Sequence, residues 1–345
     1  MTLPDFASDD RLDPRVRRVL GILSSAAPAK DLPDRDAAIA AANSDKAVAA
    51  RAMVAEATNR MNREEVASFA GISTETLTFT STPDGNTINV CMIRPEGDHV
   101  VPCVAYLHGG GMMHQSAYDG NYQAWGRLIA AEGVAVALID FRNCLTASSA
   151  PEVEPFPAGL NDCMSGVRWL SANASDLAID PSRIVVAGES GGGNLTLAVG
   201  LRLVADGQAD LVTGLYAFCP YIAGEYPQPD LPSTVELEGY FLRLQSNVGR
   251  LAYGIEAWEA RNPQAWPYYA SADDLAGMPR TVISVNECDP LRDEGIGMYR
   301  KLMAAGVPAR CRTVMGTMHA VEVIPNVCPE ISRDAARDLA AFAAG

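Results

Sequence analysis

The 345-residue sequence lacks any apolar run long enough to cross a membrane, and its first residues lack the basic and apolar stretches of a secretory signal. It is also poor in basic residues, with 27 Lys and Arg against 42 Asp and Glu, a formal net charge of −15. Nucleic acid and anionic membrane are therefore not expected as partners, because both are bound through basic surface. We expect a cytoplasmic protein that takes a neutral or cationic small molecule.

The eight cysteines include no C-x-x-C pair, and several of them fall within apolar stretches typical of strands. This distribution favours buried, reduced thiols over disulfides or zinc ligands, so we expect no metal site. Histidine is scarce as well. The chain has only four, which narrows the search for a catalytic base.

The hydrophobic pattern changes its period near residue 75. Residues 1–70 are typical of helices, with candidates at 13–23 and 44–69. Beyond them, alternating polar and apolar residues predict an antiparallel hairpin, and short apolar runs then alternate with helical stretches. The predicted strands are 76–80, 87–93, 101–107, 134–139, 183–187, 211–218, 281–285 and 310–315. We predict an α/β fold with an open, mostly parallel eight-stranded sheet and helices on both faces.

Residues 221–269 interrupt this alternation. The stretch is punctuated by prolines and holds nine of the 23 aromatic residues of the chain. A structureless loop of this length is unusual in a compact domain, so we predict an inserted, mostly helical cap. Its aromatic side chains could line an apolar pocket or simply attach the cap to the sheet, and we expect both to be partly true.

Residues 188–192 form the pattern G-x-S-x-G between a predicted strand and a predicted helix. A chain that turns so sharply forces its central residue, Ser190, into strained geometry, and only small neighbours leave room for the turn. The strain exposes the serine hydroxyl to a base and a substrate. Taken alone, the motif is equally compatible with a glycine-rich turn and an incidental serine.

The candidate base is His319, which lies just after the last predicted strand, whereas His99 lies in a polar loop typical of the surface. Asp289 follows the strand 281–285 closely and is expected to orient the imidazole. Asp293 is the alternative, but its position is more typical of the first turn of the next helix. The chain order Ser, Asp, His is that of an α/β-hydrolase triad.

A glycine run, residues 108–111 (His-Gly-Gly-Gly), follows the buried strand that ends at Leu107. Such a run can turn its N–H groups toward the negative charge of a tetrahedral intermediate, and the N–H of Gly191 should add a further donor. A flexible loop is the alternative. A phosphate cradle is excluded because no G-K-[ST] follows either glycine run.

With these motifs in order, the sequence resembles the bacterial hormone-sensitive-lipase-like esterases, a family of α/β-hydrolases. The matching stretches are 108–111, 141–142, 155–158, 188–192, 289–294 and His319. The resemblance implies the α/β-hydrolase fold and cofactor-free hydrolysis of carboxylic esters, with Gly110, Gly111 and Gly191 as oxyanion donors. It also implies that His108 braces the glycine loop, and it makes a homodimer plausible.

The resemblance further implies a cap built from the N-terminal helices and the insertion. We assign residues 46–219 and 267–345 to the catalytic domain, and residues 1–45 and 220–266 to the helical cap.

The sequence departs from the family pattern at positions beside the motifs. Glu189 stands where aspartate is common, Gly191 where alanine is common, Met112 and Met113 where an aromatic residue is usual, and Val321 at an often aromatic position. None of these changes removes a catalytic group. We therefore expect Glu189, Met112, Met113 and Val321 to shape the substrate pocket.

These observations predict a serine carboxylesterase with the triad Ser190, Asp289 and His319 that hydrolyses short- to medium-chain esters through an acyl-enzyme. Amide, carbamate or lactone hydrolysis by the same triad is the alternative. A ligand receptor on the same scaffold is a third possibility, as in the plant gibberellin receptors. Those receptors lack the catalytic histidine, so the presence of His319 speaks against it.

Overall fold

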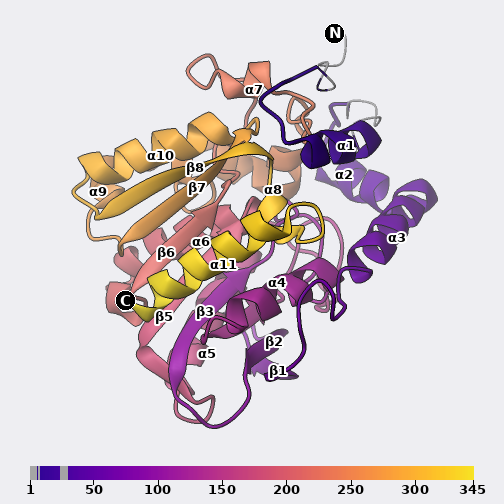
Figure 1. Cartoon of the computed structure of the whole chain (residues 1–345). Coiled ribbons are helices and arrows are strands. Elements are labelled where there is room, and N and C mark those ends of the chain that lie inside the picture. The colour runs from indigo at the N-terminus through magenta and orange to yellow at the C-terminus, as the bar shows by residue number, and fades with distance from the viewer. Residues whose placement is uncertain (1–5, 7, 24–29) are drawn as a thin grey trace.

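The computed structural model describes residues 6, 8–23 and 30–345, and its centre is one eight-stranded sheet (Figure 1). The strand order is β1-β2-β4-β3-β5-β6-β7-β8. The pairs β1–β2 and β2–β4 are antiparallel, and the six strands β4, β3, β5, β6, β7 and β8 are parallel to one another. The strands are β1 (Ile72–Thr80), β2 (Thr87–Pro95), β3 (Val101–Leu107), β4 (Ala135–Ile139), β5 (Ile179–Glu189), β6 (Gly214–Phe218), β7 (Thr281–Cys288) and β8 (Ala309–Met318). The predicted α/β fold and its mostly parallel sheet are confirmed.

Helices cover both faces of the sheet. In Figure 1, α4 and α11 lie in front of the strands, and their buried side chains pack with the residues that point to that face. On the other face α5, α6 and α10 pack against the sheet. The helices in the described residues are α1 (Pro14–Leu23), α2 (Arg35–Ala42), α3 (Asp45–Asn59), α4 (Gly120–Ala130), α5 (Ala158–Ala172), α6 (Gly191–Ala205), α7 (Ser233–Glu236), α8 (Val248–Glu259), α9 (Ala272–Leu275), α10 (Arg292–Ala304) and α11 (Pro329–Ala344).

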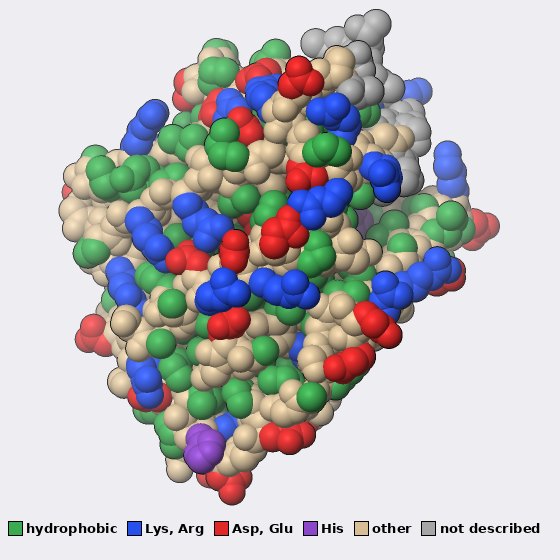
Figure 2. Space-filling model, in the orientation of Figure 1, with side chains coloured by type: hydrophobic (Ala, Val, Ile, Leu, Met, Phe, Trp, Pro, Cys, Tyr) green, Lys and Arg blue, Asp and Glu red, His purple; other side chains and the backbone are tan. Residues whose placement is uncertain are grey.

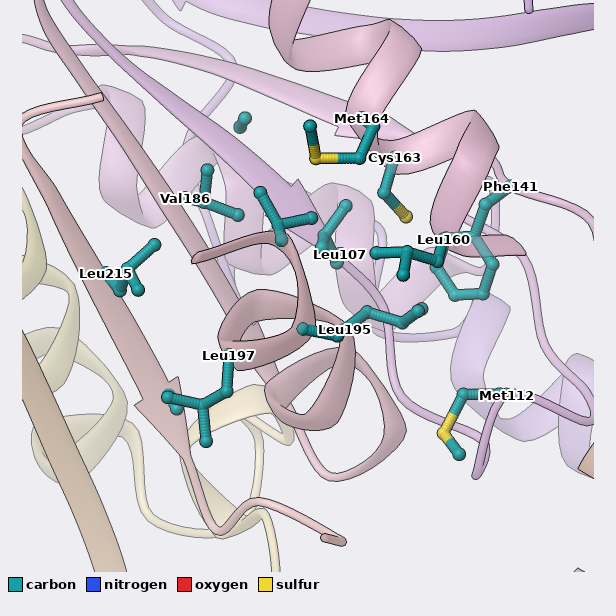
Figure 3. Close-up of a cluster of buried hydrophobic side chains, with 14 of the residues drawn as sticks. Leu107, Met112, Phe141, Leu160, Cys163, Met164, Val186, Leu195, Leu197 and Leu215 are labelled. Carbon is teal, nitrogen blue, oxygen red and sulfur yellow. The ribbon is translucent and has the colours of Figure 1, made fainter. Parts of the chain in front are cut away.

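The largest core cluster lies between the central strands and the α5–α6 layer (Figure 3). Leu107 of β3 lies beside Leu160 of α5 and Leu195 of α6, and Leu215 of β6 lies on the side of Leu197 of α6. All five are fully buried. Strands covered on both faces have no polar side to present, which explains why the sequence of these strands is nearly continuously apolar.

The N-terminal region differs from its prediction. Helix α3 begins as expected, with the Ser44 hydroxyl accepting the N–H of Ala47, but it ends at Asn59 and not at residue 69. Beyond Asn59, contacts with α4 replace the hydrogen bonds that would continue the helix. Arg127 of α4 donates to the carbonyl of Ala67 and lies over the ring of Phe69. The separate helix α2 was not predicted.

The insertion is helical only in part. It contains α7, α8 and a short 3₁₀ turn, Pro267–Tyr269, joined by irregular segments. Tyr221, Tyr253 and Trp266 of the insertion pack edge to face, with ring centroids 5.4 and 5.5 Å apart. All three belong to the large core cluster, and Tyr253 also packs on Phe156, so these rings attach the insertion to the core. Helix α2 packs on α8, which brings the N-terminal region and the insertion together. The boundaries of a catalytic domain and a cap remain a prediction.

Charged side chains of both signs are interspersed on the face shown in Figure 2. Within the described residues, no helix combines the length and the apolar character that a membrane span requires. The expectation that the chain starts without a secretory signal concerns residues that lie partly outside the described part, since residues 1–5 and 7 are not described.

The start of α6 lies in close contact with the end of β3. A Cβ atom at Gly192 would lie 1.9 Å from the carbonyl oxygen of Leu107, and one at Gly188 would lie 2.5 Å from the same atom. No side chain fits between these two backbones. Glycine at both positions is therefore required for the turn from β5 into α6 to pack against β3.

We predict that Gly192→Ala lowers the free energy of unfolding by about 2–3 kcal/mol, because the new methyl group forces two backbones apart. Gly21→Ala is the matched control, since a Cβ at Gly21 meets nothing within 4 Å in the described residues. It should raise stability by about 0.5–1 kcal/mol by stiffening α1. Denaturant unfolding of both variants measures this, and equal effects would contradict the steric explanation.

Candidate active site

Five neighbouring strands carry a chemically active residue directly after their last residue. His108 follows β3, Ser190 follows β5, Cys219 follows β6, Asp289 follows β7 and His319 follows β8. Because these strands are parallel, their carboxyl ends lie at one edge of the sheet. This edge is where sites form in open α/β sheets. The topology thus brings together residues that are up to 211 positions apart in the sequence.

Ser190 occupies the turn between β5 and α6 in a strained conformation, with φ 56° and ψ −117°. Its N–H donates to the carbonyl of Phe218 at 3.0 Å, and its carbonyl accepts the N–H groups of Asn194 and Tyr221. These bonds to β6 and to α6 hold the strained residue in place. The strained turn expected from the sequence is confirmed, and such strain is typical of functional sites.

Asp289 and His319 form a buried pair. His319 Nδ1 lies 2.7 Å from Asp289 Oδ2, and the other carboxylate oxygen accepts the N–H of Leu291 at 2.9 Å. A carboxylate only accepts, so the proton lies on Nδ1 of the imidazole. The remaining ring nitrogen, Nε2, is then free to take a proton, as a general base must.

Asp293, the alternative partner, has a different function. Its carboxylate accepts the N–H of Ser233 at 2.7 Å and pairs with Arg292 in the first turn of α10. It thus stabilises the start of that helix, as the sequence predicted.

The loop that carries His319 is held by a polar network that the sequence did not reveal. Asn286 of β7 donates to both carboxylate oxygens of Glu322 at 3.1 Å, and its Oδ1 accepts the N–H of Ala320 at 3.3 Å. Ala320 is left-handed, with φ 55°. Burial raises the pKa of Glu322, and the Asn286 amide opposes this. The network orients the residue directly after the candidate base.

In the order of the strands, Cys219 lies between Ser190 and the Asp289–His319 pair. Its Sγ, a carboxylate oxygen of Asp289 and a ring nitrogen of His319 are all within 4.8 Å of one another, and the backbone of Ser190 is also within its hydrogen-bonding reach. Burial raises the pKa of the thiol, and the carboxylates of Asp289, Glu322 and Glu189 raise it further. A raised pKa keeps the Cys219 thiol protonated, so here it acts as a weak hydrogen-bond donor.

The glycine loop closely approaches Gly191, the residue after Ser190. A Cβ atom at Gly191 would lie 2.5 Å from Met112 N and 2.7 Å from Gly111 N. Three amide groups, those of Gly111, Met112 and Gly191, therefore meet beside Ser190. Gly110, Gly111 and Met112 all have positive φ, which aligns successive N–H groups. A methyl group at position 191 would therefore displace the loop.

His108 is buried at the start of this loop. Its ring stacks on Phe141 with the centroids 4.2 Å apart, and Nδ1 lies 3.0 Å from the carbonyl oxygen of Gly109. Burial lowers its pKa, which favours the neutral ring. These contacts are those of a bracing residue.

The four positions expected to shape the pocket have different environments. Met112 and Val321 are fully buried, each in a different apolar cluster. Met113 is half-buried and packs against the cluster that contains Met112. Glu189 is only 2% exposed, and both its carboxylate oxygens accept tyrosine hydroxyls. Met112, Glu189 and Val321 therefore lie in the packed interior and not on an open wall, because each side chain is enclosed by neighbours from other elements.

Phe241, which the sequence did not single out, comes from the insertion to the site. Its ring stacks on that of His319 with the centroids 6.1 Å apart and the planes at 26°, and its backbone has φ 72°. The neighbouring Tyr240 donates to Asp9 at 2.8 Å. The N-terminal region thus anchors the loop that covers the candidate base. No local pattern signals a contact between residues 78 positions apart.

A further buried carboxylate, Glu294 of α10, lies behind the site. It accepts the N–H of Ile222 at 2.8 Å and the hydroxyl of Tyr226 at 2.8 Å. Burial raises its pKa to about 8, because a charged carboxylate is costly in the protein interior, and the nearby Asp289 adds to the shift.

Known proteins share this architecture. Residues 104–323 match the profile of a family described as having the alpha/beta hydrolase fold. The chain is 32% identical over 246 residues to carboxylesterase NlhH of Mycobacterium tuberculosis, covering 70% of this chain and 73% of that protein. It is 52% identical to the solved structure of esterase Est22, with a TM-score of 0.96 and coverage of 99% and 100% of the two chains.

A second solved structure is a brefeldin A esterase, described as a bacterial homologue of human hormone-sensitive lipase. It is 34% identical to this chain, with a TM-score of 0.84 and coverage of 98% of this chain and 94% of that one.

Glu294 predicts a loss of stability as the pH rises from about 4.5 to about 8. The unfolded chain ionises this carboxyl near its ordinary pKa of 4.5 and the folded protein near 8, so the folded state holds an extra proton between these values. Raising the pH through this window lowers the free energy of unfolding. Glu294→Gln keeps an acceptor for Ile222 but does not titrate. Its melting temperature should fall less than that of the wild type between about pH 5 and 9.

Glu65→Gln is the control, because the Glu65 side chain is 77% exposed and should leave the pH slope unchanged. Parallel curves for the wild type and Glu294→Gln would show that Glu294 does not keep its proton in the folded state.

Proposed function

The chain belongs to the α/β-hydrolase family, among the bacterial relatives of hormone-sensitive lipase, and from this premise we propose that it is a serine carboxylesterase. One observation carries the proposal: the buried Asp289–His319 pair, 2.7 Å between Oδ2 and Nδ1, lies at the same sheet edge as the strained Ser190. A nucleophile, a base and an orienting acid are the groups that acyl transfer needs. The kinship with proteins named carboxylesterase and esterase supports the same reaction.

In the proposed mechanism, His319 takes the proton of the Ser190 hydroxyl while the hydroxyl oxygen attacks the ester carbonyl. Asp289 holds the imidazole in the required tautomer and stabilises its charged form. The oxyanion receives hydrogen bonds from the loop amides, assigned to Gly110 and Gly111, and from Gly191, each donor contributing about 3 kcal/mol. His319 then protonates the leaving alcohol and activates water, which releases the acid and restores the serine.

The proposed substrates are esters with short to medium acyl chains. Phe241 over His319 and the aromatic anchoring of the insertion support a bounded pocket. Amides, carbamates and lactones pass through the same acyl-enzyme and remain the alternative class. The Asp289–His319 pair argues against an inert ligand receptor, which has no use for an oriented base.

A cytoplasmic location is supported by the eight cysteines, all of which are free thiols. The homodimer suggested by the family resemblance remains a prediction.

Ser190→Ala should abolish ester hydrolysis, lowering kcat by about 10⁴-fold or more because no other group replaces the nucleophile. The matched control is Ser332→Ala, since the Ser332 hydroxyl is buried and has no hydrogen-bond partner within the described residues. Turnover of p-nitrophenyl butyrate measures both variants. A Ser190→Ala protein as active as the wild type would overturn the assignment.

A panel of p-nitrophenyl esters from acetyl to dodecanoyl, with the matching anilides, tests the substrate class. We expect kcat/KM to be highest for the shorter acyl groups and negligible for the anilides. Phe241→Ala should move the optimum toward longer chains, because it removes the ring that lies over the base. A wild-type rate that rises steadily with chain length would contradict the bounded pocket, and anilide turnover that matches the esters would favour the amidase alternative.

A further inference from the structure

The residue before the nucleophile takes part in a buried network that the proposed mechanism does not use. Glu189 ends β5, and its carboxylate is enclosed between two tyrosines. The hydroxyl of Tyr106, from β3, lies 2.7 Å from Oε2, and that of Tyr122, from α4, lies 2.6 Å from Oε1. Both tyrosines are fully buried. The two hydroxyls thus satisfy both oxygens of one carboxylate.

The Tyr122 hydroxyl also reaches the glycine loop. Its oxygen accepts the N–H of Gly109 at 3.0 Å and lies 3.0 Å from Gln115 Oε1. Gly109 is the second residue of the loop, and a Cβ there would lie 2.4 Å from Glu189 Oε1. The carboxylate and the loop backbone are therefore in direct contact, and no side chain can stand between them.

We propose that Glu189 is a positioning residue that, through Tyr122, fixes the glycine loop relative to Ser190 and so sets the geometry of the oxyanion site. This inference rests on the proposed function. It assigns to Glu189 an action on the loop and not on the substrate, which its enclosed carboxylate does not reach.

The loop needs such a support because its own backbone is unusual. Gly110, Gly111 and Met112 have positive φ, and the backbone bonds to this stretch hold its far end: Met113 and His114 donate to the carbonyl of Gly110, and Cys144 donates to that of Met112. The donors must point at the oxyanion within a few tenths of an ångström to act in the transition state. The link from Glu189 through Tyr122 to Gly109 ties the first turn of the loop to the residue next to the nucleophile. Without the Tyr122 hydroxyl, the N–H of Gly109 would lose its 3.0 Å hydrogen bond to that oxygen and keep only its approach to the Glu189 carboxylate.

The length of the Glu189 side chain fits this task. Aspartate, common at this position in the family, is shorter by one C–C bond, about 1.5 Å. Its oxygens would be too far from both tyrosine hydroxyls. The two tyrosines lie on different elements, so they cannot both move toward the shorter side chain. Burial also raises the pKa of Glu189 to about 7, while the two tyrosine hydroxyls oppose the shift by donating to the ionised form.

Tyr122→Phe tests the link, because it removes the hydroxyl and keeps the ring. Tyr216→Phe is the matched control: this buried tyrosine also donates to a carboxylate, that of Asp338 at 2.5 Å, but it lies on the α11 side of β6 away from the loop. We expect Tyr122→Phe to lower kcat for p-nitrophenyl butyrate by about 10- to 100-fold with KM changed by less than about threefold. Tyr216→Phe should change kcat by less than about threefold.

A transition-state analogue separates positioning from general loosening of the fold. A trifluoromethyl ketone adds to the serine and places its oxygen in the oxyanion site, so its inhibition constant should rise by about the factor by which kcat/KM falls. Melting curves identify a temperature at which every variant is folded. If Tyr122→Phe and Tyr216→Phe behave alike, or if the ketone binds Tyr122→Phe as tightly as wild type, the inference is overturned.

Glu189→Asp gives a second test that does not depend on a tyrosine. It should lose kcat and ketone affinity together, like Tyr122→Phe, and wild-type values for both would overturn the inference. The outcome is distinguishable from a failure of the proposed function. A wild-type protein that hydrolyses no ester refutes the carboxylesterase itself, whereas an active wild type with unaffected Tyr122→Phe and Glu189→Asp refutes only the role of Glu189.

Discussion

The close contact of two backbones, the end of β3 and the start of α6, is the constraint on which the site depends. The carbonyl oxygen of Leu107 lies where a Cβ of Gly192 would be, and the amides of Gly111 and Met112 lie against Gly191. This contact strains Ser190, places it at the edge of the sheet and brings the glycine loop beside it. The candidate nucleophile and the candidate oxyanion donors therefore depend on the same backbone contact, and neither can move without the other.

Buried carboxylates surround this contact, and each one joins elements that are distant in the sequence. Asp289 holds His319, Glu322 holds the loop after it through Asn286, and Glu294 holds the turn after β6 through Ile222. A buried carboxylate without donors is costly, so each requires its partners to stay in place. These buried carboxylates therefore make the site rigid, although their burial is energetically unfavourable. Raised pKa values at Glu189, Glu294 and Glu322 reflect the cost.

The contacts of Gly191 and Glu189 give a physical reason for two departures from the family pattern. Gly191 leaves room for a loop that a methyl group would push away, and Glu189 supplies the reach that connects to Tyr122. Both changes act on the same loop from opposite sides of Ser190. The sequence alone suggested that these residues alter the substrate pocket. The enclosed position of Glu189 supports instead the proposal that it positions the glycine loop, while Phe241 from the insertion lies over the candidate base.

Short-range patterns determined the strands, the turn at Ser190 and the glycine loop. They also determined that the candidates Asp289 and His319 each follow a strand end, because strand periodicity shows where the strands stop. The end of α3 at Asn59, the contact of Phe241 with His319, and the partners of Glu189, Glu294 and Glu322 were decided only by the tertiary structure. These features depend on side chains that meet from separate elements. No residue type or spacing within one segment records which distant segment will satisfy a buried polar group.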